Sequence, residues 1–249
     1  MVVSLPLKER LMMGLMPARY FYRKRIAEEA EWGEHELSVL HDFVKPGGTA
    51  IDVGANQGFF AYAFAQIVDR VEAFEPNPDY ARFAKRMLGR RAHVHCVALS
   101  NRLGTAEFVV PVSDDGTVLH LGGNLQIGAA GPGKSERHSV RVATIDSYDF
   151  REVRVIKVDV EGSELQVLEG GRETILRDRP SLIVELLTGA HENPMAVSDA
   201  ICATYGYASW IVTKTGERVD ATPVIRGLES NTTWGSPIRN RNVLFLPKT

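Results

Sequence analysis

The sequence is poor in cysteine and has no excess of charge of either sign. Its 249 residues include only two cysteines, Cys96 and Cys202, which lie far apart and form no CxxC motif. This pattern excludes a disulfide scaffold and a structural zinc site. Lysine and arginine number 29 against 31 for aspartate and glutamate, a formal net charge of −2. Proteins dedicated to duplex DNA usually carry a basic excess, so we expect no nucleic-acid partner.

Long apolar runs are also missing. No stretch reaches the roughly 18 apolar residues that a transmembrane helix needs. Lys8, Glu9 and Arg10 interrupt the N-terminal apolar segment, and no small-residue cleavage site follows them. We therefore expect no transmembrane segment and no secretory signal, and we expect a cytoplasmic protein.

The first 25 residues mix apolar and basic side chains in a pattern that predicts an amphipathic helix. We interpret this helix as packed on its own domain or on a second subunit, as in a homodimer. The alternative is that a basic face contacts an anionic membrane or glycan surface. That face would consist of Arg19, Arg23, Lys24 and Arg25.

Short apolar runs alternate with helical patterns along most of the chain. This alternation predicts a parallel sheet with crossover helices. The expected strands are residues 49–53, 71–74, 93–99, 153–158, 182–184 and 242–246, and the expected helices are residues 57–68, 79–88 and 164–177. We predict one domain over residues 1–249, with a helical extension at 1–48 and a core at 49–249.

One segment, residues 101–151, breaks this rhythm. Residues 107–110 predict a strand, whereas residues 111–135 are dense in glycine. A long loop without regular structure is uncommon in a compact domain and is often functional. We interpret the segment as an insertion that faces the substrate as a lid. The alternative is an ordinary surface excursion.

The strongest local motif is a glycine-bearing turn between the first expected strand and its helix. The residues Asp52, Gly54, Asn56 and Gly58 form the pattern D-x-G-x-N-x-G. A dinucleotide fingerprint requires G-x-G-x-x-G, which is not present. The acid-first pattern is typical of loops that bind S-adenosylmethionine, and amide groups at the start of the helix can hold an anionic group.

A second acid, Glu75, ends the next strand, 23 positions after Asp52. An acid about 20 residues beyond a glycine loop is placed to accept hydrogen bonds from ribose hydroxyls. Glu75 therefore favours a nucleoside cofactor. The alternative is a solvent-exposed acid that caps a turn.

Three further acids follow neighbouring strands. Asp159 and Glu161 end the strand that contains Lys157, and Glu185 ends the next one. They are expected to converge at one sheet edge, where they could ligate a divalent cation such as Mg²⁺ or supply a general base. The alternative is a salt-bridged network with nearby bases: Lys157, Arg154 or Arg179.

Four segments in order resemble the FkbM-type S-adenosylmethionine-dependent methyltransferases. They are IDVGANQGFF, FEPNP, VALSNRLG, and the block TIDSY…VRVIKVDVEGSELQVLEGG…RPSLIVEL; the closing RNVLFLP agrees as well. The resemblance runs from about residue 49 to 185. It implies an α/β, Rossmann-like class I methyltransferase fold: a mostly parallel seven-stranded sheet with helices on both faces and an antiparallel last strand.

The resemblance also implies methyl transfer from S-adenosylmethionine to a hydroxyl of a sugar, glycan or glycosylated natural product. One alternative acceptor is a polyketide-type hydroxyl, and another reading is a nucleoside-cofactor-binding protein without catalysis. An NAD-dependent oxidoreductase is disfavoured, because it would need G-x-G-x-x-G and usually Tyr-x-x-x-Lys. The chain has that spacing only at Tyr20 and Lys24, before the first strand.

Matching positions imply the cofactor contacts. The methionine part would be surrounded by Asp52, Gly54, Ala55, Asn56, Gln57, Gly58 and Phe59. Glu75 would hold the ribose, with Pro76 and Asn77 alongside. The adenine would be bordered by Ala98, Leu99 and Ser100. Asp159 would lie near the methionine amino group or the reacting centre.

A sugar hydroxyl is a poor nucleophile at neutral pH and should need a base or a metal. The candidates are Asp159, Glu161, Glu185 and His191, with His120 and His138 as weaker ones. Stacking on a sugar ring is open to Trp32, Trp210 and Trp234, although tryptophan more often packs in a core or rim. The triplet Glu34-His35-Glu36 could border the cofactor, but a solvated helix face is the simpler expectation.

Overall fold

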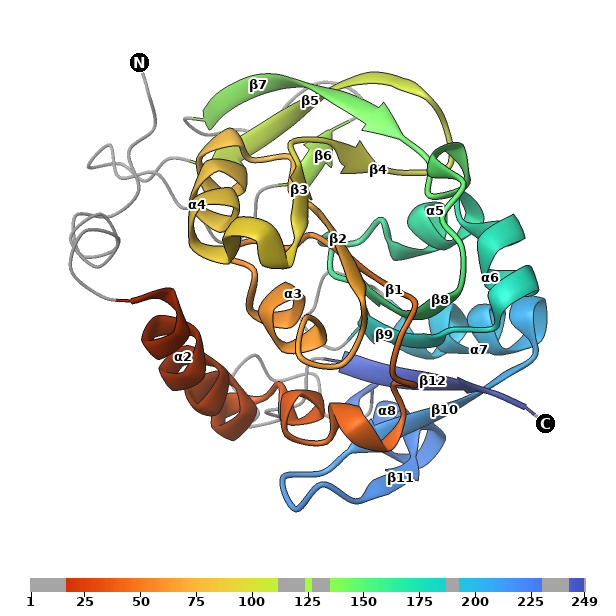
Figure 1. Ribbon diagram of the computed structural model, residues 1–249. Helices are drawn as coiled ribbons and strands as arrows, with labels where there is room; N and C mark the ends of the chain where they lie inside the picture. Colours follow the sequence, from red (N-terminus) through yellow and green to blue (C-terminus); the bar gives the residue numbers. More distant parts are fainter. Residues whose placement is uncertain (1–16, 112–123, 127–134, 187–192, 230–241, 249) are drawn as a thin grey trace.

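The computed structural model describes residues 17–111, 124–126, 135–186, 193–229 and 242–248 (Figure 1). The first 16 residues of the expected amphipathic helix, and the candidates His120, His191 and Trp234, lie outside these ranges. Among the helices of the described ranges, none combines the length and apolarity needed to cross a membrane.

A mostly parallel sheet forms the centre of the molecule. Its strands, in spatial order, are β11 (Arg218–Asp220), β10 (Tyr207–Val212), β12 (Asn242–Pro247), β9 (Ser181–Glu185), β8 (Val153–Val158), β1 (Thr49–Val53), β2 (Arg70–Phe74) and β3 (His93–His95). The strands from β9 to β3 pair in parallel. The last strand, β12, runs antiparallel to both of its neighbours, as predicted.

The sheet has eight strands, so the predicted number of seven was wrong. The additional strand is β11, which pairs antiparallel with β10 at the sheet edge. A tight turn joins the two, in which the Gly216 N–H donates to the Thr213 carbonyl at 2.9 Å. All three residues of β11 are exposed, so the strand has no apolar signature in the sequence.

Helices cover both faces of the sheet, as predicted (Figure 1). On one face lie α2 (Ala18–Trp32), α3 (Phe59–Phe64) and α4 (Pro78–Leu88), and on the other lie α5 (Glu164–Glu169), α6 (Arg172–Asp178), α7 (Pro194–Tyr205) and α8 (Ala221–Glu229). Short 3₁₀ turns are η1 (His35–Ser38), η2 (Leu40–Asp42), η3 (Gly89–Arg91) and η4 (Asp146–Tyr148). Each face has its own apolar core, one around Phe64 and Phe83 and one around Ile175 and Ile201.

The helix expected over 164–177 is divided into α5 and α6. The break falls at Gly170, where the chain passes close to another backbone segment. A Cβ atom on Gly170 would lie only 2.0 Å from the carbonyl oxygen of Ser100. This close approach is possible only for glycine and packs the start of the 101–151 insertion against the core.

The insertion contributes strands to a second sheet, in which the strand predicted at 107–110 is part of β5 (Gly104–Pro111). Its strands, in order, are β4 (Ala98–Leu99), β7 (Ser135–Ala143), β5 (Gly104–Pro111) and β6 (Asn124–Gln126). The single strand expected at 93–99 is therefore two strands, β3 and β4, in different sheets. Residues 112–123 and 127–134 lie outside the described ranges, so a lid role for them stays a prediction.

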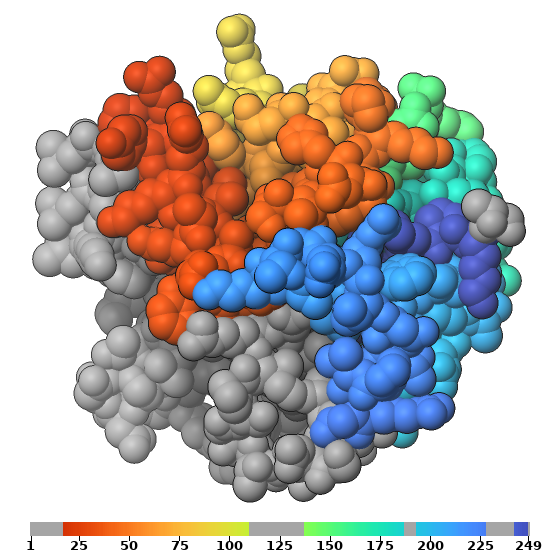
Figure 2. All heavy atoms as spheres, turned by 90° about the horizontal axis from the view of Figure 1, so that it is seen from below, coloured from red at the N-terminus to blue at the C-terminus, as the bar shows by residue number. Residues whose placement is uncertain are grey.

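The N-terminal segment is packed against the core. Figure 2 shows it, in red to orange, beside the blue segment that carries β10 and β11. The Tyr22 hydroxyl donates to the Gln57 carbonyl at 2.8 Å, and the Ser181 hydroxyl donates to the Phe43 carbonyl at 2.7 Å. An ion pair joins Lys214 to Glu31. Packing on its own domain was one of the three possibilities considered for this segment, which the structure describes from residue 17 onward.

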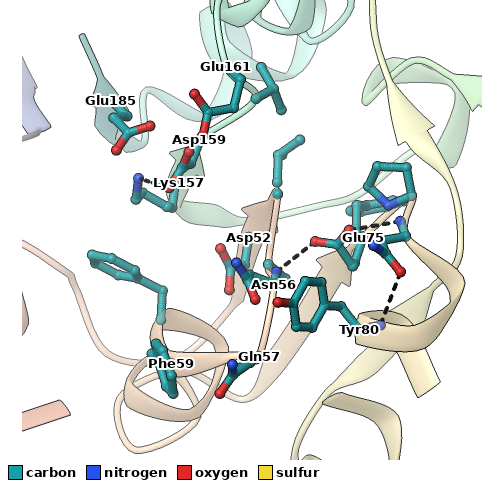
Figure 3. A pocket seen from close by; sticks show the side chains of 18 of the residues that line it. Asp52, Asn56, Gln57, Phe59, Glu75, Tyr80, Lys157, Asp159, Glu161 and Glu185 are labelled. Carbon is teal, nitrogen blue, oxygen red and sulfur yellow. Dashed lines mark hydrogen bonds and ion pairs between the residues drawn. The ribbon is translucent and has the colours of Figure 1, made fainter. Parts of the chain in front are cut away.

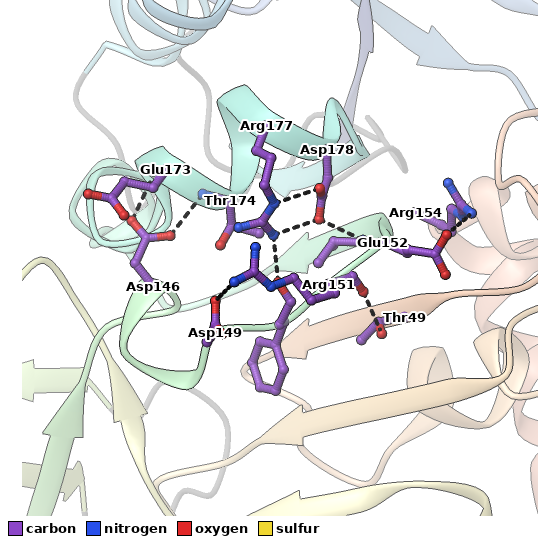
Figure 4. Close-up of polar contacts among 12 residues, drawn as sticks. Thr49, Asp146, Asp149, Arg151, Glu152, Arg154, Glu173, Thr174, Arg177 and Asp178 are labelled. Carbon is purple, nitrogen blue, oxygen red and sulfur yellow. Dashed lines mark hydrogen bonds and ion pairs between the residues drawn. The ribbon is translucent and has the colours of Figure 1, made fainter.

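Polar contacts fix the edge of the sheet where β1 and β8 begin (Figure 4). Asp178 accepts a hydrogen bond from the Val153 N–H at 2.9 Å and pairs with Arg177. The Asp146 carboxylate accepts the N–H groups of Glu173 and Thr174, at 3.0 and 2.9 Å, in the first turn of α6. The contact between Asp178 and Val153 lies at the start of β8, at the opposite end of that strand from Asp159.

Candidate functional site

A pocket of about 240 Å³ lies at the carboxyl ends of β1, β2, β8 and β9 (Figure 3). This is where open α/β sheets bind ligands. Of the predicted cofactor residues, those that line it are Asp52, Gly54, Ala55, Asn56, Gln57, Phe59, Glu75, Pro76, Asn77, Ala98, Leu99 and Asp159. Gly58 and Ser100 are not among the lining residues.

The glycine turn is held between β2 and β8. The N–H groups of Gly54 and Ala55 both donate to the Phe74 carbonyl, at 2.9 and 3.0 Å. The backbone of Gly54 has φ +78°, and a Cβ atom there would lie 1.7 Å from the Asp159 carbonyl oxygen. No side chain fits in this space. The turn therefore brings its backbone directly against the strand end that carries the acidic cluster.

Asp52 acts inside the turn rather than at its surface. Its Oδ2 accepts the Ala61 N–H of α3 at 2.8 Å, which joins the strand end to the helix start. Burial raises the pKa of Asp52 to about 7, although Lys157 and the Ala61 N–H lower it. The residue is thus a structural part of the turn and also lines the pocket.

Glu75 is held on both carboxylate oxygens. Its Oε2 accepts the Asn56 N–H at 2.7 Å, and its Oε1 accepts the Asn77 N–H at 2.8 Å (Figure 3). The side chain is only 6% exposed, so the alternative of a solvent-exposed acid is wrong. Burial raises the pKa of Glu75 to about 7. Each oxygen keeps a lone pair for a further donor, such as a ribose hydroxyl.

Asn56 offers an unused acceptor beside Glu75. It adopts a left-handed conformation with φ +48°, which turns its N–H toward Glu75. Its side-chain oxygen Oδ1 is buried and has no hydrogen-bond partner among the described residues. Buried polar atoms are nearly always satisfied, so this oxygen fits a ligand that carries a hydroxyl or an ammonium group. These features match what a nucleoside cofactor with a charged tail requires.

The region expected to border adenine is apolar. It is lined by Phe74, Val97, Ala98, Leu99 and Phe108. Phe108 belongs to β5, so the second sheet contributes to this wall. The Ser100 N–H donates instead to the Ala143 carbonyl, at 2.9 Å, behind the wall.

The three predicted acids do meet at one edge of the sheet. Asp159, Glu161 and Glu185 each place a carboxylate oxygen within 4.8 Å of the others. Lys157 joins them, with its Nζ 3.4 Å from Asp159 Oδ2. Burial, followed by the neighbouring Asp159, raises the pKa of Glu185 well above its ordinary value. Burial therefore favours the protonated form of Glu185.

Of the three bases named in the salt-bridge alternative, only Lys157 joins this cluster. Arg154 pairs with Glu152 at 3.4 Å. Arg179 donates to the carbonyls of Tyr205 and Gly206, the latter at 3.0 Å. Lys157 is therefore the one base of the three that faces these acids, so the cluster is not a salt-bridged network in which each acid has its own base.

The Glu34-His35-Glu36 triplet is not a solvated helix face, contrary to the simpler expectation. Glu34 lines the pocket, and His35 and Glu36 are buried residues of η1. Asn242, at the start of β12, donates to Glu36 Oε2 at 3.3 Å and accepts from Lys157 Nζ at 2.9 Å. The sequence does not predict this bridge, because Glu36, Lys157 and Asn242 come from three distant segments.

The pocket has a further wall that the sequence did not predict. Arg25 and Glu29 of α2 line it together with Glu34. Arg25 donates to Glu29 at 3.0 Å and lies 5.4 Å above the ring centroid of Phe59. From the sequence, Arg25 is expected only as part of the basic face of the N-terminal segment, and it is the packing of α2 against α3 that brings these residues to the pocket. Trp32, Trp210 and His138 do not line it.

Comparisons with known proteins agree with this architecture. The methyltransferase FkbM domain model matches residues 52–201. The 2-O-methyltransferase NoeI of Sinorhizobium fredii (strain NBRC 101917 / NGR234) is 26% identical over 200 residues, which cover 72% of this chain and 80% of that protein.

A crystal structure of methyltransferase FkbM from Methylobacillus flagellatus KT has the same fold. It superposes with a TM-score of 0.51 at 18% identity, covering 85% of this chain and 50% of that one. This chain therefore spans about half the length of that relative. The fold is that of the class I S-adenosylmethionine-dependent methyltransferases, and the chain belongs to the FkbM methyltransferase family.

Proposed function

We propose that this protein transfers a methyl group from S-adenosylmethionine to a hydroxyl oxygen of a sugar, glycan or glycosylated natural product. One observation carries the proposal: the residues suited to the cofactor and those suited to proton transfer line the same pocket. Glu75 and the unsatisfied Asn56 Oδ1 line it on one side, and the Asp159/Glu185 pair lines it on the other (Figure 3). The similarity to NoeI, a 2-O-methyltransferase, supports transfer to oxygen.

The cofactor residues in this proposal follow from the donors and acceptors present. Glu75 would accept the ribose hydroxyls, and the apolar wall around Leu99 would contact the base. Asn56 and Asp159 would accept from the amino group of the methionine tail. When bound, S-adenosylmethionine supplies an electrophilic methyl group whose sulfur departs with the bonding electron pair.

The acidic pair would take the proton of the acceptor hydroxyl. Lys157, 3.4 Å from Asp159 Oδ2, favours an ionised Asp159, while burial favours a protonated Glu185. Asp159 is then the base and Glu185 the neutral neighbour that donates to it. Glu161, on the same edge, is the second candidate base. His191 remains a third candidate, outside the described residues.

A divalent cation is the competing role for these acids. Three carboxylate oxygens within 4.8 Å are suitable ligands for Mg²⁺. However, the ion would have to displace the proton of Glu185 and would be repelled by the ammonium of Lys157. We therefore favour proton transfer over metal binding at this cluster.

Polar side chains favour a hydroxyl-rich acceptor over an apolar polyketide. Arg25, Glu29 and Glu34 form the outer wall, and Phe59 offers an aromatic surface beside them. Carboxylates and a guanidinium can hydrogen-bond several sugar hydroxyls at once, whereas an apolar acceptor would remove water from these charged groups without offering hydrogen bonds in its place.

The test combines binding and turnover. We expect S-adenosylhomocysteine to bind in calorimetry. We also expect the protein to convert S-adenosylmethionine to S-adenosylhomocysteine when neutral methyl glycosides are supplied as acceptors. Asp159→Asn should slow that conversion by about 100-fold or more at saturating S-adenosylmethionine, because it removes the proposed base, whereas Glu185→Gln keeps a donor toward Asp159 and should slow it much less. A Glu217→Gln variant, at an exposed turn far from the pocket, is the matched control. Failure of the wild-type protein to bind S-adenosylhomocysteine would refute the proposal.

A further inference from the structure

A buried lysine stands at the end of β8, beside the position proposed for the reacting centre. Lys157 is only 1% exposed and lines the pocket. Its ammonium donates to Asn242 Oδ1 at 2.9 Å, lies 3.4 Å from Asp159 Oδ2, and sits 5.2 Å from the ring centroid of Phe60. It is thus anchored on one side and faces the acids on the other (Figure 3).

The anchor of Lys157 continues deeper into the protein. Asn242 donates its amide to Glu36 Oε2 at 3.3 Å, and both residues are 0% exposed. The other Glu36 oxygen, Oε1, has no hydrogen-bond partner among the described residues. Burying a charged pair and its bridge usually stabilises a fold less than apolar residues of similar size would. The arrangement therefore indicates a function beyond packing.

The lysine carries its charge inside the pocket. Burial alone would lower the pKa of Lys157, but the carboxylates of Asp159, Glu34, Glu185 and Asp52 together raise it above its ordinary value. The side chain is therefore a fixed positive charge among negative groups.

A fixed positive charge matters because methyl transfer changes the charge of the cofactor. The sulfonium of S-adenosylmethionine is a cation, whereas the sulfur of S-adenosylhomocysteine is neutral. A pocket lined only by carboxylates would bind the cation far more tightly than the neutral product. Such binding stabilises the reactant more than the transition state, in which the positive charge is already dispersing, and so it slows transfer.

We propose that Lys157, anchored by Asn242 and Glu36, is a charge-balancing residue that weakens the preference of the pocket for the sulfonium cofactor over its neutral product. The inference rests on the proposed function, because it assumes that this pocket holds S-adenosylmethionine. The Lys157 ammonium repels the positively charged sulfonium directly. Glu36 weakens this repulsion, because its negative charge partly offsets the positive charge of the Lys157 ammonium.

Two variants with opposite expected effects test the proposal without any acceptor. Calorimetry gives the dissociation constants of S-adenosylmethionine and S-adenosylhomocysteine at about pH 8, where a Glu36 with a pKa of about 7 is mostly ionised. Lys157→Met should increase the preference for S-adenosylmethionine by about fivefold or more. Glu36→Gln should decrease that preference by about twofold or more. Lys214→Met, an exposed surface variant, should leave it unchanged.

The ratio of the two constants separates electrostatics from structure. A purely structural role would change both affinities together, so an unchanged ratio in both variants overturns the inference. If Lys157→Met does not fold, as judged by circular dichroism, Glu36→Gln decides alone: an unchanged or increased preference contradicts the inference. Binding of neither ligand by the wild-type protein would instead refute the proposed function, which is a different result from an unchanged ratio.

Discussion

The carbonyl oxygen of Asp159 lies 1.7 Å from where a Cβ atom on Gly54 would be. This relationship joins the glycine turn after β1 to the acidic cluster after β8, and the Asp159 N–H reinforces it by donating to the Val53 carbonyl at 2.9 Å. The two halves of the site therefore cannot move independently. A substitution in the turn should therefore also alter the acidic cluster after β8.

Gly54→Ala tests this coupling. The new methyl group must displace the backbone of Asp159, so we expect a loss of about 2 kcal/mol or more in the free energy of unfolding and loss of S-adenosylhomocysteine binding. Gly89→Ala is the matched control. Gly89 also has a positive φ of +59°, but no atom lies within 4 Å of its added methyl group. It should cost about 1 kcal/mol and leave binding intact. Equal effects of the two variants, in denaturant unfolding and calorimetry, would contradict the coupling.

The affinity for S-adenosylhomocysteine should depend on the ionisation of Glu75. Its pKa of about 7 in the free protein means that the carboxylate forms as the pH rises through neutrality. A protonated Glu75 loses acceptor capacity, so the affinity should fall by about tenfold between pH 8 and pH 6. Glu75→Gln should weaken binding and remove this part of the pH dependence. If the affinity of Glu75→Gln changes with pH as steeply as that of the wild-type protein, another group is responsible for the pH dependence.

The unliganded protein should be more stable at mildly acidic than at mildly alkaline pH. Asp52, Glu75 and Glu36 have folded-state pKa values of about 7, above their ordinary values near 4. A raised acid pKa contributes stability that is present at low pH and lost as the pH rises between the two values. We therefore expect the Tm of the unliganded protein to fall as the pH rises from about 5 to about 8. A Tm that rises over this interval would contradict the assignment of these acids as buried.

Asp146 should matter for stability and not for binding. Its carboxylate accepts two N–H groups in the first turn of α6, and Asp146 does not line the pocket (Figure 4). Asp146→Ala should cost about 1–2 kcal/mol in the free energy of unfolding, as measured in denaturant. The affinity for S-adenosylhomocysteine should stay within about twofold of wild type. A large loss of affinity would mean that this contact at the start of α6 is coupled to the pocket.

The sequence predicted the parts of the site that are local. The strand, turn and helix around Gly54 can be read from one stretch of chain, and Glu75 follows from its distance to that turn. The convergence of Asp159, Glu161 and Glu185 follows from the geometry of parallel strands. Each of these features depends on neighbours in sequence or on a rule that holds for every sheet of this kind.

The remaining features depend on contacts between distant segments. Nothing near Glu36 or Asn242 in the sequence indicates that they meet, and Glu34-His35-Glu36 has the composition of an exposed helix face. The exposed strand β11 gives no apolar alternation, so the eighth strand could not be counted. Glycine in residues 111–135 suggested a loop that in fact contains β6, and β7 was not predicted, because cross-strand pairing depends on partners far along the chain.

The central claim is that this pocket binds S-adenosylmethionine and its product. The most direct measurement is calorimetric titration of the protein with S-adenosylhomocysteine, with and without Mg²⁺. We expect micromolar binding in both conditions, because Glu75, Asn56 and Asp159 supply the contacts without a metal. Loss of that binding in Glu75→Ala would establish the site. No binding by the wild-type protein in either condition would contradict the account, and the glycine turn would then be only a packing feature of the fold.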